Sequence, residues 1–73
     1  MSVHDSTKDE IVSEVINAYK GVSAVQRRFN YKQPMGVYNW RARGIPRSLI
    51  ADIHIDTGIP IIRLQQAQAS AAA

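Results

Sequence analysis

The sequence predicts a compact all-α domain of four to five helices that contains a helix-turn-helix. Three observations favour this fold class. Apolar residues recur at the three- and four-residue spacing of helices, and glycine and proline punctuate the chain at intervals typical of short helices. The chain has 73 residues and no cysteine, so it has room for one core and no disulfide to support it.

The first helix is expected from Lys8 to Tyr19. Thr7 and Glu10 have the spacing of a capping box, and Gly21 is a plausible C-terminal stop. The apolar positions on one face are Ile11, Val12, Val15, Ile16 and Tyr19. One side of this helix should therefore face the core.

Two short helices separated by a sharp turn follow. Ser23 is expected to cap the second helix, which has Val25 and Phe29 as apolar positions and ends near Asn30. Asn30 tolerates a left-handed conformation and can reverse the chain. The third helix, at about 34–42, starts with Pro34, because proline suits the first helical position. Its apolar stripe is Val37 and Trp40, and Gly44 closes it.

A fourth helix is predicted between Pro46 and Gly58, with a buried face formed by Leu49, Ile50, Ile53 and possible packing by His54. Pro60 can begin a fifth helix through Leu64 and Gln68, although Ile59–Ile62 would serve equally well as a short strand; we favour the helix. Residues 1–64 are expected to form one domain, and residues 65–73 a flexible tail.

The net charge of +3 conceals a strong asymmetry along the chain. Residues 15–51 contain no acid, whereas both ends are net negative. The cations of this central segment are Lys20, Arg27, Arg28, Lys32, Arg41, Arg43 and Arg47. A block of one sign repels itself within a folded domain, so the pattern favours an anionic partner over a merely solvated face.

Several other classes of function find little support in the sequence. His54 and its neighbouring acids Asp52 and Asp56 have i, i+2 spacing, which points them in different directions on a helix, so we expect no enzyme. We expect no cofactor, no metal and no small-molecule ligand. The acidic N-terminus is unlike a signal peptide, and the longest apolar run is far too short to span a bilayer, which predicts a soluble cytoplasmic protein.

The third helix carries residue types that read DNA. With Val37 and Trp40 buried, Met35, Tyr38, Asn39 and Arg43 face outward. Asparagine and glutamine can pair with adenine, arginine with guanine, and apolar groups with thymine methyls. Gln33 lies at the helix start, where side chains enter a groove most deeply.

Residues 29–46 read Phe-Asn-Tyr-Lys-Gln-Pro-Met-Gly-Val-Tyr-Asn-Trp-Arg-Ala-Arg-Gly-Ile-Pro. This stretch resembles the helix-turn-helix of the phage Cro repressor family, and the resemblance extends over about residues 21–64. Its most specific part is the Val-x-x-Trp helix followed by Arg-x-Arg-Gly-Ile-Pro. The resemblance implies a homodimer that binds double-stranded operator DNA and represses transcription in a bacterial host, where the bound protein would be nucleoid-associated.

The resemblance also implies a set of contact residues. Those expected to meet bases are Gln33, Pro34, Met35, Tyr38, Asn39 and Arg43. Those expected to meet phosphates are Ser23, Arg27, Arg28, Lys32, Arg41 and Arg47. The chain departs from the family at Gln26, where a small alanine is usual, and at Asn30, where the turn usually has glycine. The turn is also one residue longer.

The sequence leaves alternatives open. The apolar residues Ile59, Ile61, Ile62 and Leu64 could contribute to a dimer interface or could all cover the monomer core. An architectural or excision-directing phage protein would also bind DNA, but by bending it. A small protein-interaction domain could use the basic face to meet an acidic protein.

Overall fold

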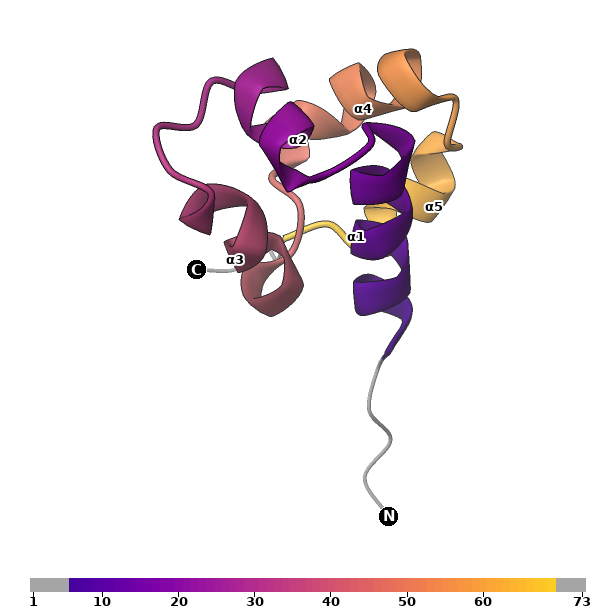
Figure 1. Ribbon diagram of the computed structural model, residues 1–73. Helices are drawn as coiled ribbons and strands as arrows, with labels where there is room; N and C mark the ends of the chain where they lie inside the picture. Colours follow the sequence, from indigo (N-terminus) through magenta and orange to yellow (C-terminus); the bar gives the residue numbers. More distant parts are fainter. Residues whose placement is uncertain (1–5, 70–73) are drawn as a thin grey trace.

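A computed structural model describes residues 6–69 as one packed bundle of short helices (Figure 1). The elements are α1 (Ser6–Ala18), α2 (Val22–Arg28), α3 (Met35–Arg43), a 3₁₀ turn η1 (Arg47–Leu49), α4 (Ile50–Thr57) and α5 (Ile61–Gln65). Within residues 6–69 there is no strand, only an isolated parallel bridge between Ile45 and Gln68. The predicted all-α class is confirmed, and the fifth segment is a helix.

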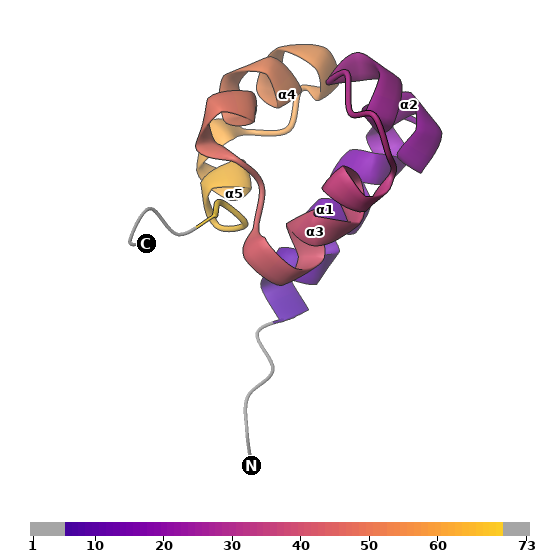
Figure 2. The same cartoon turned by 90° about the vertical axis from the view of Figure 1, so that its left-hand side faces the viewer.

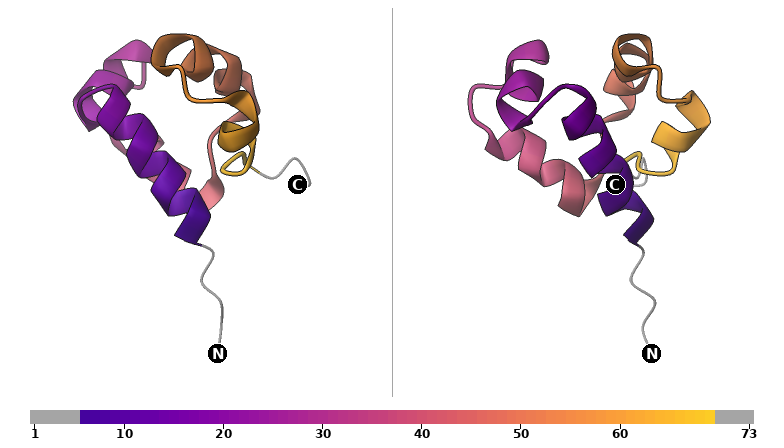
Figure 3. Two further views of the ribbon diagram at one scale, coloured as in Figure 1. Left: turned by 90° about the vertical axis from the view of Figure 1, so that its right-hand side faces the viewer. Right: turned by 45° about the vertical axis from the view of Figure 1, so that its right-hand side comes forward.

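Every helix contributes to a single core. Its fully or nearly fully buried apolar residues are Ile11, Val12, Val15, Ile16, Val25, Val37, Trp40, Ile45, Ile50, Ile53, Ile59, Leu64 and Ala67. The stripe predicted for the third helix is among them in full. Those predicted for the first and fourth helices are buried except for Tyr19, Leu49 and His54, which are only partly buried. Figure 2 shows the turn between α2 and α3 on the near side, whereas the left view of Figure 3 shows α1 in front. The turn between α2 and α3 and the outer side of α1 thus face opposite sides of the molecule.

Both α1 and α2 end in a Schellman motif. After α1, the Gly21 N–H donates to the Ile16 carbonyl at 2.9 Å, and the left-handed residue is Lys20, with φ 71°. The left-handed residue that ends the helix is therefore one residue before the predicted stop at Gly21. After α2, Asn30 takes the left-handed conformation with φ 61°, as the sequence predicts. These two motifs satisfy helix-end carbonyls and reverse the chain within a few residues.

Three of the predicted helix starts differ from the structure. The helix expected from Lys8 begins at Ser6. The second helix begins at Val22 with Gly21 as its N-cap residue, and no side chain caps it. Ser23 lies inside the first turn, so it cannot be the N-cap. Pro34 was expected to be the first helical residue but is the N-cap residue of α3, which begins at Met35 and ends at Arg43. The Pro34 carbonyl accepts the Val37 N–H at 2.9 Å and the Tyr38 N–H at 3.1 Å.

The segment after α5 packs on the domain where the sequence predicts a tail from Gln65. The helix ends at Gln65, and the chain then returns to the end of α3. The Ile45 N–H donates to the Ala67 carbonyl, and the Ala69 N–H donates to the Ile45 carbonyl, both at 2.8 Å. This pairing satisfies the backbone of a buried residue that belongs to no helix, so the domain extends to Ala69. Residues 70–73 of the predicted tail lie outside the described residues.

Candidate nucleic-acid interface

α3 presents a polar strip to solvent and buries its opposite side. Val37 and Trp40 are fully buried, whereas Met35 and Tyr38 are 59% and 52% exposed and Asn39 is also exposed. The spacing of Met35, Tyr38 and Asn39 places them on one face of the helix. Gln33, Pro34 and Arg43 are exposed as well, so all six residues predicted to contact bases are accessible.

Aromatic packing fixes the orientation of α3. The Trp40 ring meets Phe29 and Tyr31 edge-on, with centroid distances of 6.1 and 6.4 Å. Its Nε1–H donates to the Tyr31 hydroxyl at 3.2 Å. Because the indole has both apolar contacts and a hydrogen-bond partner, it holds the buried side of the helix in one position.

A lysine from α1 supports the other end of α3. The Lys8 ammonium donates to the Ala42 carbonyl at 3.1 Å, where the last turn leaves carbonyls without helical partners. A cation at this end also complements the helix dipole. Sequence reasoning placed Lys8 in the acidic N-terminal part of the chain and missed this contact, which spans 34 residues.

Most of the predicted phosphate contacts surround this helix. Arg27 near the end of α2, Lys32 in the turn, Arg41 in α3 and Arg47 in η1 are all exposed. Ser23, although not a cap, is exposed in the first turn of α2. The cations therefore come from each of the consecutive segments from α2 to η1.

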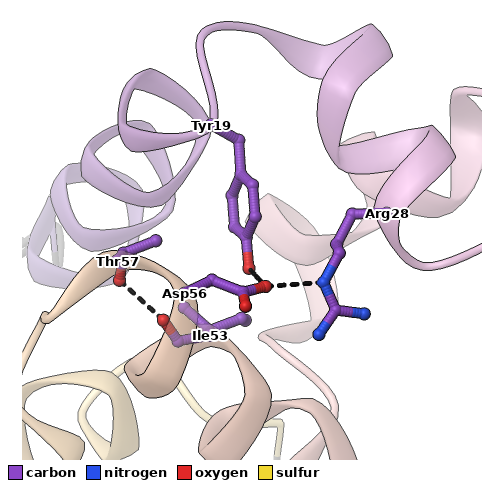
Figure 4. A network of polar contacts seen from close by, with 5 residues as sticks. All are labelled: Tyr19, Arg28, Ile53, Asp56 and Thr57. Carbon is purple, nitrogen blue, oxygen red and sulfur yellow. Dashed lines mark hydrogen bonds and ion pairs between the residues drawn. The ribbon is translucent and has the colours of Figure 1, made fainter.

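Arg28 has a different environment (Figure 4). Its Nε donates to an Asp56 carboxylate oxygen at 2.6 Å, and the Tyr19 hydroxyl donates to the same oxygen at 2.5 Å. The guanidinium also lies 4.9 Å from the centroid of the Phe29 ring. We call Tyr19, Arg28 and Asp56 the carboxylate cluster. It links Tyr19, which directly follows α1, to α2 and α4, so Asp56 is not a freely solvated acid.

The contacts of the carboxylate cluster shift the pKa of each member. The Tyr19 hydrogen bond, followed by the Arg28 guanidinium, holds the pKa of Asp56 below its usual value. Burial and the hydrogen bond to Asp56 raise the pKa of Tyr19. The hydrogen bond to Asp56 raises the pKa of Arg28. At neutral pH the carboxylate is therefore ionised and the phenol is neutral, which is the state that the hydrogen bonds require.

The outer side of α1 is acidic. Asp9, Glu10 and Glu14 line a shallow depression there together with Arg63 of α5. The Arg63 Nε donates to Glu14 at 2.7 Å, which offsets one charge of each sign. This side of α1 faces away from the turn between α2 and α3 (Figures 2 and 3). The acids of α1 therefore lie on a different side of the molecule from the exposed cations Arg27, Lys32, Arg41 and Arg47.

Ala42 lies on the same exposed face of α3 as Tyr38 and Asn39, and the sequence analysis did not identify it as part of that face. It is exposed and lies three residues after Asn39 and four after Tyr38, so it shares their face. The same spacing in the sequence could have identified it. A methyl group at this position lets the helix end approach a flat surface closely.

The remaining titratable residues of the described range 6–69 form no recognisable site. The Nδ1 atom of His54 lies 2.7 Å from the Ile59 carbonyl, so the imidazole is part of the connection between α4 and α5. Within residues 6–69, no group of three histidine or acidic side chains could hold a metal ion. In the same part of the chain, no helix has the length and apolar character needed to cross a membrane.

Comparisons with protein-family models, with curated proteins and with solved structures found no match to this chain. The protein is therefore characterised by its fold and by the surface around α3. It is a small all-α domain that exposes one polar face of a firmly seated helix among arginine and lysine side chains.

Proposed function

We propose that this protein binds double-stranded DNA by inserting α3 into the major groove, and that it acts as a transcriptional repressor of the phage Cro type. The observation that carries this proposal is the two-sided character of α3. Val37 and Trp40 anchor it in the core, and Met35, Tyr38 and Asn39 are held outward. An α-helix has a diameter of about 10–12 Å, which suits a major groove about 12 Å wide.

The exposed strip offers the chemistry needed to distinguish bases. The Asn39 amide can donate to and accept from adenine, and the Arg43 guanidinium can donate two hydrogen bonds to guanine. Met35 and Tyr38 offer apolar contact to thymine methyl groups. Gln33 and Pro34 would approach the bases at the N-terminal end of the helix. Sequence preference would therefore come from a few side chains of one element.

The surrounding cations would supply most of the affinity. Arg27, Lys32, Arg41 and Arg47 would contact phosphates, with Ser23 as a hydrogen-bond donor. Each phosphate neutralised releases a counterion, so binding would weaken as salt rises. Arg28 would contribute less, because Asp56 already offsets its charge.

A second copy of the chain is the expected protein partner. Ile55 of α4 and Ile61 and Ile62 of α5 are 76%, 41% and 72% exposed, although these helices otherwise pack into the core. A homodimer joined through these residues would hide apolar surface and bring two α3 helices to one operator. The described molecule measures 38 × 25 × 24 Å, a size compatible with half-sites about 34 Å apart.

The mechanism would be occupancy of the operator in the cytoplasm of a bacterial host, where the bound protein would block access of RNA polymerase. It needs no cofactor and no chemical step. Affinity would come from the phosphate contacts and choice of site from α3.

The test is an anisotropy titration of labelled duplex DNA at low and high salt, combined with selection of bound sites from a random pool. We expect salt-sensitive binding and an enriched, two-fold symmetric sequence. Arg43→Ala should weaken binding, whereas Arg63→Ala, which removes the same charge from the acidic side of the molecule, should have little effect. Absence of binding at low salt, or insensitivity to salt, would refute the proposal.

A further inference from the structure

Tyr31 connects α2 to α3: its backbone is hydrogen-bonded to α2, and its side chain contacts α3. On the α2 side, its backbone N–H donates to the Gln26 carbonyl at 2.9 Å. The Gln26 side-chain amide returns a hydrogen bond to the Tyr31 carbonyl at 3.3 Å. Two hydrogen bonds to one residue therefore fix the path of the chain just after the left-handed Asn30.

On the α3 side, the Tyr31 ring lies between the first turn and the centre of the helix. Its hydroxyl accepts the Trp40 Nε1–H at 3.2 Å. Its ring lies so close to Gly36 that a Cβ atom there would come within 2.5 Å of Cδ1. The ring is thus held between a fixed chain reversal and two successive turns of α3.

Gly36 is needed for this contact and not for its backbone conformation. The glycines with positive φ within the described chain are Gly21, Gly44 and Gly58. Gly36 is helical, and at such a position alanine is intrinsically the better helix former. The requirement for glycine therefore comes from the Tyr31 ring.

The contacts of Tyr31 control how α3 is rotated about its own axis. A rotation of about 20° moves an atom about 5 Å from the axis by about 2 Å. That displacement is enough to lose a hydrogen bond to a base edge. Met35, Tyr38 and Asn39 would all be displaced together, whereas flexible arginine and lysine side chains could still follow the phosphates.

We propose that Tyr31, seated by Gln26 and Gly36, is a positioning residue that sets the base preference of α3 without contacting a base. The proposal rests on the DNA-binding function proposed above. In the turn the Gln26 amide satisfies the Tyr31 carbonyl, which keeps the backbone beside the ring in one conformation.

The experiment compares Gly36→Ala in two backgrounds, the natural chain and Tyr31→Ser, which removes the ring. Selected-site and nonspecific affinities are measured for each variant, together with its melting temperature. In the natural chain, Gly36→Ala should lower the ratio of selected-site to nonspecific affinity about tenfold or more. Nonspecific affinity should stay unchanged. In the Tyr31→Ser background, which itself lowers the ratio, Gly36→Ala should cause no further loss and should raise the melting temperature.

Tyr31→Phe serves as the mild variant, because it keeps the ring and removes only the hydroxyl. It should shift the Trp40 indole N–H signal in the NMR spectrum of the free protein and lower the affinity ratio less than Gly36→Ala does. A purely structural role would lower the melting temperature and leave the affinity ratio unchanged.

The outcomes separate the two proposals. If the natural chain selects a DNA sequence and Gly36→Ala keeps that preference, the positioning role of Tyr31 is wrong. It is also wrong if Gly36→Ala has the same effect with and without the ring. If the natural chain selects no sequence, the proposed function fails, and the role of Tyr31 in base preference fails with it.

Discussion

Asn39 and Arg27 are both exposed, but we expect them to contribute to DNA binding in different ways. Asn39 lies in the middle of the α3 strip, whereas Arg27 lies near the end of α2. Asn39→Ala should change the base preferred at one position of each half-site, at a cost of about 1–3 kcal/mol on the natural site. Arg27→Ala should weaken binding to all sequences and reduce the salt dependence. Equal losses on every sequence for Asn39→Ala, measured by competition, would contradict its reading role.

The carboxylate cluster predicts a pH dependence of stability. The pKa of Asp56 is lowered in the folded state, so its contribution is present above the unfolded value of about 3.9. It is lost as the pH falls through the folded pKa. Asp56→Asn should therefore lower the urea midpoint at pH 7, and the difference from the natural chain should disappear in strong acid. A difference that persists unchanged in strong acid would show that the charge is not responsible.

Tyr19→Phe tests the other end of the same cluster. It keeps the ring beside Phe29, where the centroids are 5.8 Å apart, and removes only the hydroxyl. The pKa of Tyr19 is raised in the folded state, so its contribution is present below about pH 10 and lost as the pH rises further. We expect a lower urea midpoint than the natural chain at pH 7 and a shrinking difference above pH 10.

At the scale of elements, local sequence signals were enough to locate the helices. Their caps and the side-chain contacts between them depend on residues that are far apart in the chain or on the preceding turn. Helical spacing predicted the buried Val37 and Trp40, and Gly44 and Gly58 end α3 and α4 as expected. The sequence could not show that Gly21 takes the N-cap position ahead of Ser23, because the preceding Schellman motif places it there. The same holds for the Lys8 and Asp56 contacts, which join residues far apart in the chain. The exposure of Met35, Tyr38 and Asn39 followed from the helix period alone.

Gly44 should be the least replaceable of the glycines that end helices. Its φ is 97°, and a Cβ there would lie 2.7 Å from the Ala69 Cα. Gly44→Ala should destabilise the domain by about 3 kcal/mol, because backbone strain adds to a clash with backbone atoms. Gly58→Ala is the matched control, since its φ is 77° but no atom lies within 4 Å. It should cost only about 1 kcal/mol in urea unfolding. Equal effects of the two substitutions would rule out the contact with Ala69.

On the scale of the whole molecule, the distribution of charge matters more than the net value. The exposed cations run from α2 to η1, and the acids of α1 line the depression on the other side of the core. Such a separation orients the molecule as it approaches a polyanion. The sequence located the basic block, but only the fold brings its residues onto one surface: α3 packs directly against α1 and α2, and its exposed face points away from the outer side of α1.

Dimerisation should depend on the exposed isoleucines. Ile62→Glu should shift the protein toward monomer in sedimentation experiments and weaken operator binding, because a charge would have to be buried. Its nonspecific affinity for short duplexes should change much less. Glu10→Gln is a surface control that leaves the apolar residues intact. A monomeric natural chain, both free and on its operator, would contradict the predicted interface.

The pairing of Ile45 with the segment after α5 has a consequence for local opening. The Ile45 and Ala69 amides each donate across this pairing, so their exchange with deuterated solvent reports on it directly. If the final segment detaches without unfolding the helices, these two amides will exchange faster than the Val37 and Trp40 amides. The domain would then have a hinged C-terminal closure, whose opening uncovers Gly44 at the end of α3.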